Sequence, residues 1–351
     1  MRVSTEVLRL PLRDPFRIAR EEHPSLSTTV IVSLELAGLR GVGEAFPVAY
    51  YGETAGTVEQ VVPYLVARLD ELGEPPTERE AALDWLARAA ELMEAALGHN
   101  GGAKCGIDIA LHDICAQRLG LPLHELVGVR EPAPATDFSL GLDSPLAVAE
   151  RARQVAHFPA LKIKVGGVHD LATLRAVREV YDGALRVDAN TGWQPDEALA
   201  LLPDLQALGV EFVEQPFPAR QLAQLRWLQE RSPLPIVADE SAVTVDDLDA
   251  LVGVVGGVNV KLAKCGGIGP ARRMLLRARE LGLRTMLGCM VETSVGVRAA
   301  LAVGGLAEWL DLDGNLLLAD DPFAGLELGE DCHWRQPAGV GLGLTRRPSA
   351  V

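Results

Sequence analysis

LKIKVGGVHDLATLRAVREVYDGALRVDAN (161–190) contains the pattern that decides the fold of this 351-residue chain. It begins with an apolar run, LKIKV, continues through apolar residues at helical spacing, and ends in a second apolar run, LRVDA. A buried strand, an amphipathic helix and another buried strand make one unit of a parallel sheet. Within the first run, Lys162 and Lys164 lie two positions apart, so on a strand both side chains point to the same face.

The same alternation of apolar runs and helical stretches recurs from about residue 136 onwards. A short buried strand followed by an amphipathic helix, repeated about eight times, is typical of a (β/α)8-type barrel. A doubly wound sheet is the alternative, but it requires a glycine-rich turn after its first strand, and DFSLGLDSPLAVAE (137–150) has none. We therefore predict an α/β fold built on a modified TIM barrel. The apolar runs are DFSLGL, LKIKV, LRVDA, VEFVEQP, PIVADE, GVNVKLAK, RTMLGCM and EWLDLDG.

The first part of the chain lacks this repeat. TVIVSLEL (29–36) is rich in β-branched residues, and GLRGVGEA (38–45) is typical of a hairpin turn that leads into a second strand. Three stretches with apolar residues at helical spacing follow, and the third ends at Gly120, with Pro122 just beyond it. Strands followed by helices predict a separate α+β domain. The three helical stretches are residues 58–73, 78–98 and 106–120.

The end of the chain, GLELGEDCHWRQPAGVGLGLTRRPSAV (325–351), is rich in glycine, and we expect it to be mostly irregular. Such a segment has no apolar face of its own to form an independent core, so we expect it to pack back onto the N-terminal part. The predicted organisation is a capping domain at residues 1–130, a barrel at 131–322 and a tail at 323–351 that packs on the capping domain.

Composition excludes several classes of partner. The formal net charge of −15 argues against binding to nucleic acids or to anionic membranes, because both require a basic surface. We find no apolar run of membrane-spanning length and no signal-peptide pattern at the N-terminus. The five cysteines are scattered without metal-ligand spacing, which predicts free thiols in a reducing cytoplasm. Apolar helices on the outside of such a barrel would allow a homo-oligomer.

Acidic residues end three consecutive apolar runs of the predicted barrel. Asp188, Glu214 and Asp239 would lie side by side, because the active site of this fold is built at the carboxyl ends of its strands. Three adjacent carboxylates repel one another unless a cation holds them. Oxygen ligands without a nearby histidine or cysteine favour a hard cation, so these residues predict a Mg²⁺ site.

Lysines flank the predicted metal site on both sides. Lys162 and Lys164 belong to the second barrel strand and Lys261 to the sixth, so they face each other across the ring. Two opposed lysines can remove a proton from one face of a substrate and deliver one to the other face. A metal that binds the substrate carboxylate would stabilise the charge developing on it. This arrangement predicts proton abstraction beside a carboxylate through an enediolate.

Taken together, these residues resemble the enolase superfamily, in its muconate-lactonizing-enzyme subgroup, and the resemblance covers essentially the whole chain. It implies that Asp188, Glu214 and Asp239 bind Mg²⁺, that Lys164 and Lys261 are the two acid/base residues, and that Lys162 helps to bind the substrate carboxylate. The motifs that carry it are PFRIA (15–19), AYYGET (49–54), GIDIALHDICAQRLGLPLHELVG (106–128), LKIKVG, RVDAN, VEQP, ADES, NVKLAKCGGI and GCMVETSVG.

The end of the eighth run is similar to the D-x-D of the dipeptide epimerases in that subgroup. The resemblance implies that Asp311 and Asp313 hold the α-ammonium group of a dipeptide, and that Ser139, Cys289 and Val291 contact its backbone. An ammonium group offers three hydrogen-bond donors, which suits two carboxylates on one face. We therefore expect a dipeptide epimerase that inverts the α-carbon of the C-terminal residue.

Other activities stay open at this stage. The subgroup also contains N-acylamino-acid racemases, o-succinylbenzoate synthases and muconate-type cycloisomerases. Barrel lysines form Schiff bases in aldolases, which is a more remote alternative, and a binding protein without catalysis is another.

The sequence also allows more than one type of side chain on the epimerised residue. In this family, the loop after PFRIA closes over the site, and relatives that act on Ala-Glu carry a basic residue there. Arg20 could serve that role here, whereas an inward Glu21 would favour a cationic substrate, and two tyrosines of the second loop would accept apolar or aromatic side chains. The candidate specificity residues are Arg20, Glu21, Tyr50, Tyr51 and Glu292.

Overall fold

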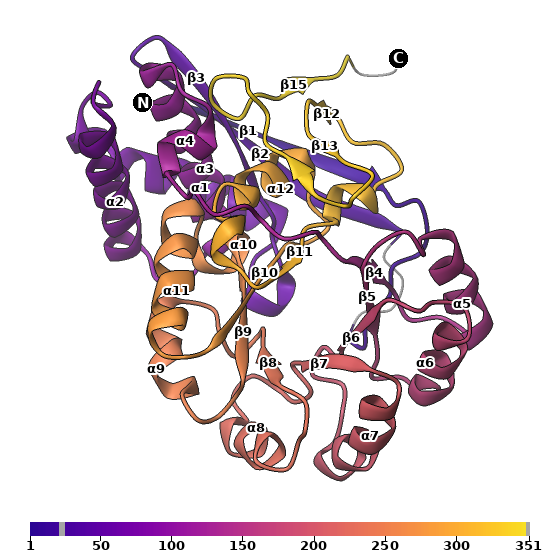
Figure 1. The fold of residues 1–351 in the computed structure, drawn as a ribbon. Coiled ribbons are helices and arrows are strands. Elements are labelled where there is room, and N and C mark those ends of the chain that lie inside the picture. The colour runs from indigo at the N-terminus through magenta and orange to yellow at the C-terminus, as the bar shows by residue number, and fades with distance from the viewer. Residues whose placement is uncertain (21–24, 349–351) are drawn as a thin grey trace.

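Eight parallel strands form the larger sheet of this protein, whose computed structural model describes residues 1–20 and 25–348. Each strand pairs with the next one along the chain, and helices lie around the outside of the sheet (Figure 1). The strands are β4 (Phe138–Leu140), β5 (Ala160–Lys164), β6 (Ala184–Asp188), β7 (Val210–Glu214), β8 (Ile236–Ala238), β9 (Gly257–Lys261), β10 (Arg284–Gly288) and β11 (Trp309–Asp311).

The two edges of this sheet approach each other and nearly close a barrel. The Asp137 backbone N–H donates to the Leu310 carbonyl at 3.0 Å, and the Leu312 N–H donates to the Thr136 hydroxyl oxygen at 2.9 Å. The predicted (β/α)8-type barrel is therefore confirmed. Its helices are α5 (Pro145–Gln154), α6 (Asp170–Arg178), α7 (Pro195–Ala207), α8 (Leu222–Gln229), η3 (Val245–Asp247), α9 (Leu248–Leu251), α10 (Leu262–Cys265), α11 (Ile268–Glu280), α12 (Ser294–Leu301), η4 (Gly304–Leu306) and η5 (Gly314–Leu316).

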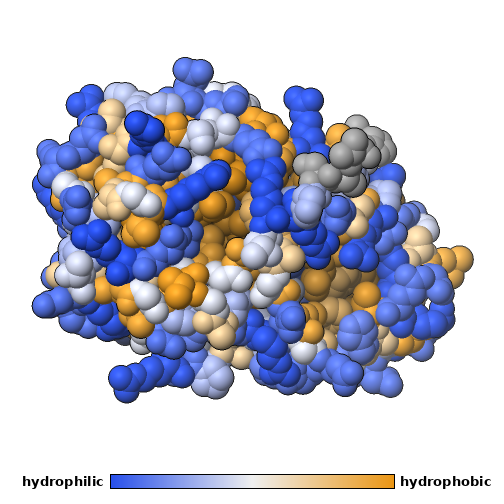
Figure 2. Space-filling view, turned by 90° about the horizontal axis from the view of Figure 1, so that it is seen from above, coloured by the Kyte–Doolittle hydropathy of each residue, from blue (hydrophilic) through white to orange (hydrophobic). Residues whose placement is uncertain are grey.

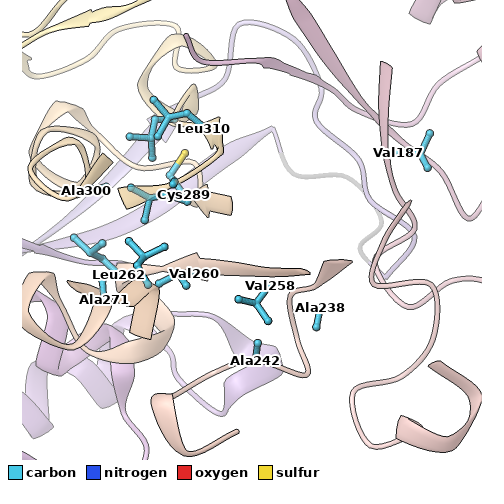
Figure 3. Close-up of a cluster of buried hydrophobic side chains, with 14 of the residues drawn as sticks. Val187, Ala238, Ala242, Val258, Val260, Leu262, Ala271, Cys289, Ala300 and Leu310 are labelled. Atoms are coloured by element: carbon cyan, nitrogen blue, oxygen red, sulfur yellow. The ribbon is translucent and has the colours of Figure 1, made fainter. Parts of the chain in front are cut away.

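Apolar side chains and polar site residues occupy alternate positions along a barrel strand. On β9, Val258 and Val260 are fully buried in one hydrophobic cluster that also contains Ala271 of α11 (Figure 3). Asn259 and Lys261 occupy the alternate positions and contact carboxylates at the barrel's centre. Side chains two positions apart share a face of a strand, so β9 both packs against helices and presents polar groups inward.

A second sheet and four α-helices make up the N-terminal part. The strands β1 (Arg2–Pro11), β2 (Leu26–Leu36) and β3 (Leu39–Ala45) pair antiparallel, and Ala37 and Gly38 form the hairpin turn with φ of 52° and 77°. Positive φ at both turn residues matches the right-handed twist of the paired strands. The helices are η1 (Ala49–Tyr51), α1 (Ala55–Arg68), η2 (Asp70–Leu72), α2 (Arg79–Ala96), α3 (Gly101–Leu119) and α4 (Leu123–Val127).

Helix α3 lies directly on β3. A Cβ at Gly43 would come within 1.9 Å of the Gly106 carbonyl oxygen, so glycine allows the strand and helix backbones to touch. The helix begins before the predicted residue 106, because Glu53 accepts hydrogen bonds from the Gly102 and Ala103 N–H groups at 3.0 and 3.1 Å. It ends as predicted at Gly120, which has a φ of 67°.

Two-residue strands occur in the glycine-rich tail, which was predicted to be mostly irregular. The Gly341 carbonyl accepts from the Leu123 N–H at 2.8 Å, and Arg346 forms an ion pair with Glu6. The Trp334 indole donates to the Leu312 carbonyl at 2.8 Å, so the tail contacts both the N-terminal part and the barrel (Figure 1). The strands are β12 (Phe323–Ala324), β13 (Glu327–Leu328), β14 (Trp334–Arg335) and β15 (Thr345–Arg346).

Strand β1 is the main element that the sequence prediction missed. Its residues alternate between exposed and half-buried, and none is fully buried. A strand without a buried face has weak apolar periodicity, which is the main sequence signal for a strand. Across the described ranges, the structure contains no helix that is long and apolar enough to span a membrane.

Candidate active site

Three buried carboxylates meet at the carboxyl end of the barrel. Asp188 ends β6, Glu214 ends β7 and Asp239 follows β8, and one oxygen from each lies within 4.8 Å of the other two. Glu214 Oε2 is buried and accepts no hydrogen bond from the described residues. Burial and the charge of Asp188 raise the pKa of Glu214 to about 7. A buried oxygen without a hydrogen bond, among three carboxylates, fits a divalent cation.

Hydrogen bonds orient these carboxylates from outside. The Asn190 N–H donates to Asp188 Oδ1 at 2.9 Å, and Asn259 Nδ2 donates to Glu214 Oε1 at 2.7 Å. Lys264 contacts Asp239 and donates to the Ala242 and Asn259 carbonyls at 3.0 and 2.8 Å. Four oxygens, one of a carboxylate and three of backbone carbonyls, hold the Lys264 ammonium group, so this lysine supports the site by positioning Asp239.

Lys164 and Lys261 lie on either side of the carboxylates. Lys164 Nζ donates to Asp188 Oδ2 at 2.6 Å from β5, and Lys261 Nζ donates to Asp239 Oδ2 at 2.9 Å from β9. Both side chains are buried. Burial lowers the pKa of Lys261, but Asp239 and Glu214 outweigh it and hold that pKa above its ordinary value. A cation bound to the same carboxylates would weaken this effect by competing for their charge.

A second acidic pair lies at the junction of β11 and β4. Asp311 accepts from the Ser139 hydroxyl at 3.1 Å, and Asp313 accepts from the Ser139 backbone N–H at 2.6 Å. Lys162 forms an ion pair with Asp311, and its Nζ lies 3.6 Å from Glu214 Oε2. Cys289 Sγ lies 4.0 Å from Asp313 Oδ1. The structure therefore brings together Ser139, Lys162, Cys289, Asp311 and Asp313, which were predicted to bind the substrate.

The pKa values of the two aspartates shift in opposite directions. Burial raises the pKa of Asp311, but the Lys162 ammonium outweighs burial and holds that pKa below its usual range. Burial and the charge of Asp311 raise the pKa of Asp313 to about 6. Among the residues that the structure describes, Asp313 forms no salt bridge. Asp313 is thus the acid still available to a cationic ligand.

The N-terminal part covers one side of the site. The Ser27 hydroxyl donates to the Val291 carbonyl at 2.7 Å, which joins the start of β2 to the loop after β10. Arg20 forms an ion pair with Glu240, and its guanidinium lies 4.4 Å from the centre of the Tyr50 ring. Glu21, the remaining loop candidate, lies outside the described residues.

The other candidates from the specificity loops lie in different surroundings. Tyr51 lies edge-on to Tyr50, with ring centres 5.2 Å apart, and burial raises its pKa. Glu292 is buried behind the site, where burial and the charge of Glu44 raise its pKa. Glu44 itself accepts hydrogen bonds from Thr293, so this acidic pair lies at the start of α12.

A cavity of about 340 Å³ connects these groups. Its walls come from the strand ends and from the cap, and both lysines of the predicted proton transfer line it. A larger cavity of about 460 Å³ lies beside α5 and shares only Ser139 with the candidate site residues. The smaller cavity is lined by Leu12, Phe16, Ile18, Arg20, Leu26, Ser27, Thr28, Phe46, Pro47, Val48, Ala49, Tyr51, Ser139, Lys162, Lys164, Asn190, Asp239, Glu240, Lys261, Cys289, Met290, Val291, Asp311, Asp313 and Leu317.

Sequence reasoning missed three contacts of this site. Asn259 precedes Lys261 by two positions, so strand alternation could have placed it on the inner face. The contact between Lys162 and Asp311, 149 positions apart, had no such signal. The contact between Arg20 and Glu240 is equally remote in the sequence.

Residues 147–350 match the family described as "Enolase C-terminal domain-like", and residues 2–128 match "Mandelate racemase / muconate lactonizing enzyme, N-terminal domain".

Among curated relatives, the L-Ala-D/L-Glu epimerase of Bacteroides thetaiotaomicron is 36% identical over 91% of this chain and 81% of its own. The L-Lys-D/L-Arg epimerase of Methylococcus capsulatus is 35% identical over 98% of both chains. The solved dipeptide epimerase of Enterococcus faecalis, in complex with Mg and L-Leu-L-Tyr, has a TM-score of 0.88 and 30% identity, covering 98% of this chain and 99% of that one. The named relatives thus differ in the side chains of their substrates.

Proposed function

Because this chain belongs to the mandelate racemase / muconate lactonizing enzyme family of the enolase superfamily, we propose that it is a Mg²⁺-dependent dipeptide epimerase. The observation that carries the proposal is the buried Asp313, which is close to Asp311 and Ser139 and forms no salt bridge with the described residues. A buried carboxylate of this kind fits an ammonium ligand. The α-ammonium of a dipeptide supplies that charge, whereas an N-acylamino acid or a muconate has none.

The reaction follows from where the two ends of a dipeptide would lie. With the ammonium group at Asp313, the C-terminal carboxylate reaches toward Asp188, Glu214 and Asp239, and its α-carbon lies between Lys164 and Lys261. One lysine removes the α-proton, and the other donates a proton to the opposite face, which inverts the centre. Mg²⁺ bound by the three carboxylates would neutralise the charge that develops on the substrate carboxylate.

The surrounding residues would hold the dipeptide in this position. We assign Lys162 to the substrate carboxylate, because it is the cation between Asp311 and Glu214. Ser139, Cys289 and Val291 line the same cavity and would contact the peptide backbone. A Schiff-base reaction is less consistent with this site, because the three carboxylates between Lys164 and Lys261 fit a metal ion, which a Schiff-base reaction does not require.

Deuterium exchange tests the proposed function directly. The enzyme is incubated in D₂O with MgCl₂ and a library of L,L-dipeptides, and mass spectrometry measures deuterium gained at the α-carbon. We expect exchange and epimerisation at the C-terminal residue of some dipeptides, and none with N-succinyl amino acids. Exchange with N-succinyl amino acids but with no dipeptide would instead support an acylamino-acid racemase.

We also propose that the protein works in a reducing compartment, the cytoplasm. All five cysteines are free in the structure, and four of them are buried. Proteins of oxidising compartments commonly use cysteines in disulfides.

A further inference from the structure

The part of the cavity beside Arg20 contains two opposite charges that cancel each other. We propose that this chain epimerises dipeptides whose C-terminal residue has an uncharged, apolar side chain, such as Leu, Met or Phe, and that the Arg20–Glu240 ion pair determines this preference. The inference rests on the proposed function, because it concerns the side chain attached to the epimerised carbon.

The position of that side chain follows from the two ends of the dipeptide. Its ammonium group is assigned to Asp313, after β11, and its carboxylate to the metal site, so the C-terminal residue would lie at the β8 end of the cavity, three strands away from β11. Asp239, Glu240 and Arg20 line this end, and Tyr51 covers it from the cap.

Arg20 and Glu240 hold each other in place. Arg20 Nη1 contacts Glu240 Oε1, and the Glu240 side chain is only 1% exposed. The guanidinium also lies over the Tyr50 ring, 4.4 Å from its centre, so two contacts hold the Arg20 side chain. An acidic substrate side chain would have to compete with Glu240 for Arg20. A cationic one would meet a Glu240 whose charge Arg20 already offsets, with only Glu240 Oε2 left without a hydrogen bond from the described residues.

No other free charge remains on this wall among the described residues. The other cations that line the cavity, Lys162, Lys164 and Lys261, are each paired with a carboxylate. A charged substrate side chain would therefore lose water without gaining a partner, which is costly in a buried site.

Apolar groups make up most of the cap side of the cavity. They come from the segment before the specificity loop, from the start of β2 and from the loop after β3. Leu26 is 50% exposed, so it keeps apolar surface that a substrate side chain could bury. On the face shown in Figure 2, hydrophobic residues line a hollow near the centre, between projecting hydrophilic ones. The apolar lining on the cap side comprises Leu12, Phe16, Ile18, Leu26, Phe46, Pro47, Val48, Ala49 and Tyr51.

The test compares four substrates in one enzyme. Epimerisation of L-Ala-L-Leu, L-Ala-L-Phe, L-Ala-L-Glu and L-Ala-L-Lys is followed by chiral chromatography with MgCl₂ present, and kcat/KM is obtained for each. We expect the Leu and Phe dipeptides to exceed the Glu and Lys dipeptides by about 100-fold, since an unpaired buried charge costs several kcal/mol. A preference for either charged dipeptide overturns the inference but leaves the epimerase proposal intact, whereas no turnover of any dipeptide refutes that proposal itself.

Two variants test the ion pair in opposite directions. Glu240→Gln frees Arg20 and should raise the kcat/KM ratio of Ala-Glu to Ala-Leu by at least about 10-fold. Arg20→Met frees Glu240 and should raise the ratio of Ala-Lys to Ala-Leu by a similar factor. Each ratio is measured within one enzyme, so a general loss of activity or metal affinity cancels. If a folded variant keeps both wild-type ratios, the ion pair does not set the specificity.

Discussion

Replacing Asp313 by asparagine removes the charge that we assign to the dipeptide ammonium while keeping the size of the side chain. The asparagine oxygen can still accept the hydrogen bond from the Ser139 N–H, which is 2.6 Å long in the structure. Local geometry should therefore persist, and the change should act on substrate binding. We expect KM for the preferred dipeptide to rise strongly, with a smaller fall in kcat, because the ammonium group is equally bound in the ground state and the transition state.

The size of the effect follows from the surroundings of Asp313. The residue is 3% exposed, and its neighbour Asp311 is already paired with Lys162. Asp313 therefore supplies the net charge for the ligand. A charge-assisted hydrogen bond in a buried site contributes about 3 kcal/mol, so kcat/KM should fall by about 100-fold.

The pH dependence gives a second measurement on the same residue. Burial and Asp311 raise the pKa of Asp313 to about 6. The carboxylate is the form that attracts an ammonium group, so kcat/KM of the wild type should decline as the pH falls below about 6. The profile of kcat/KM reports groups of the free enzyme, and the asparagine variant should lack this decline.

The assay measures epimerisation of the preferred dipeptide by polarimetry between pH 5 and 9, with Mg²⁺ saturating. Asp331→Asn is the matched control, because Asp331 is a carboxylate of the tail whose side chain is 51% exposed. It should leave kcat/KM unchanged. If Asp313→Asn keeps kcat/KM within about threefold of the wild type, the ammonium group does not bind at Asp313 and the reasoning fails.

Further predictions concern catalysis, the metal and stability. Lys164→Ala and Lys261→Ala should each reduce epimerisation by at least about 1,000-fold, and full activity in either would exclude a two-base reaction. Chelation with EDTA should abolish activity, and MgCl₂ should restore it. Gly43→Ala should lower the unfolding free energy, measured by urea denaturation, by about 2 kcal/mol, because the added Cβ would lie 1.9 Å from a carbonyl oxygen of α3. Gly98→Ala is the control and should leave the unfolding free energy unchanged, because a Cβ there meets no atom within 4 Å. Burial lowers the pKa of His112, but its partner Asp108 outweighs burial and raises that pKa. The stability that His112 contributes should therefore be present at pH 5.5, below the unfolded-state pKa, and should decline toward pH 9. The unfolding free energy of His112→Gln, measured in urea, should lack this pH dependence.

Most of the barrel could be predicted from the sequence. The eight apolar runs correspond to β4–β11, since a strand buried between helices and the barrel interior must be apolar over its length. Strand β1 could not be predicted in the same way, because pairing with β2 stabilises it without burying either of its faces completely.

The predicted strand-end residues likewise lie close together in the structure. The barrel itself ensures this, since the parallel strands all end at the same rim. Asp188 and Glu214, for example, are register partners on neighbouring strands. A fixed fold therefore converts positions in the sequence into positions in the site, although it does not determine which charges pair.

The sequence by itself determined the strand order, the common face of Lys162 and Lys164, and the three carboxylates between two lysines. These features follow from the period of the apolar residues and the spacing of the charged ones, which are local properties of the sequence. Only the tertiary structure decided that Lys162 pairs with Asp311 and that Arg20 pairs with Glu240. Ion pairs depend on distances of a few ångströms between side chains that are far apart along the chain, and only the folded packing of the barrel and the cap determines those distances.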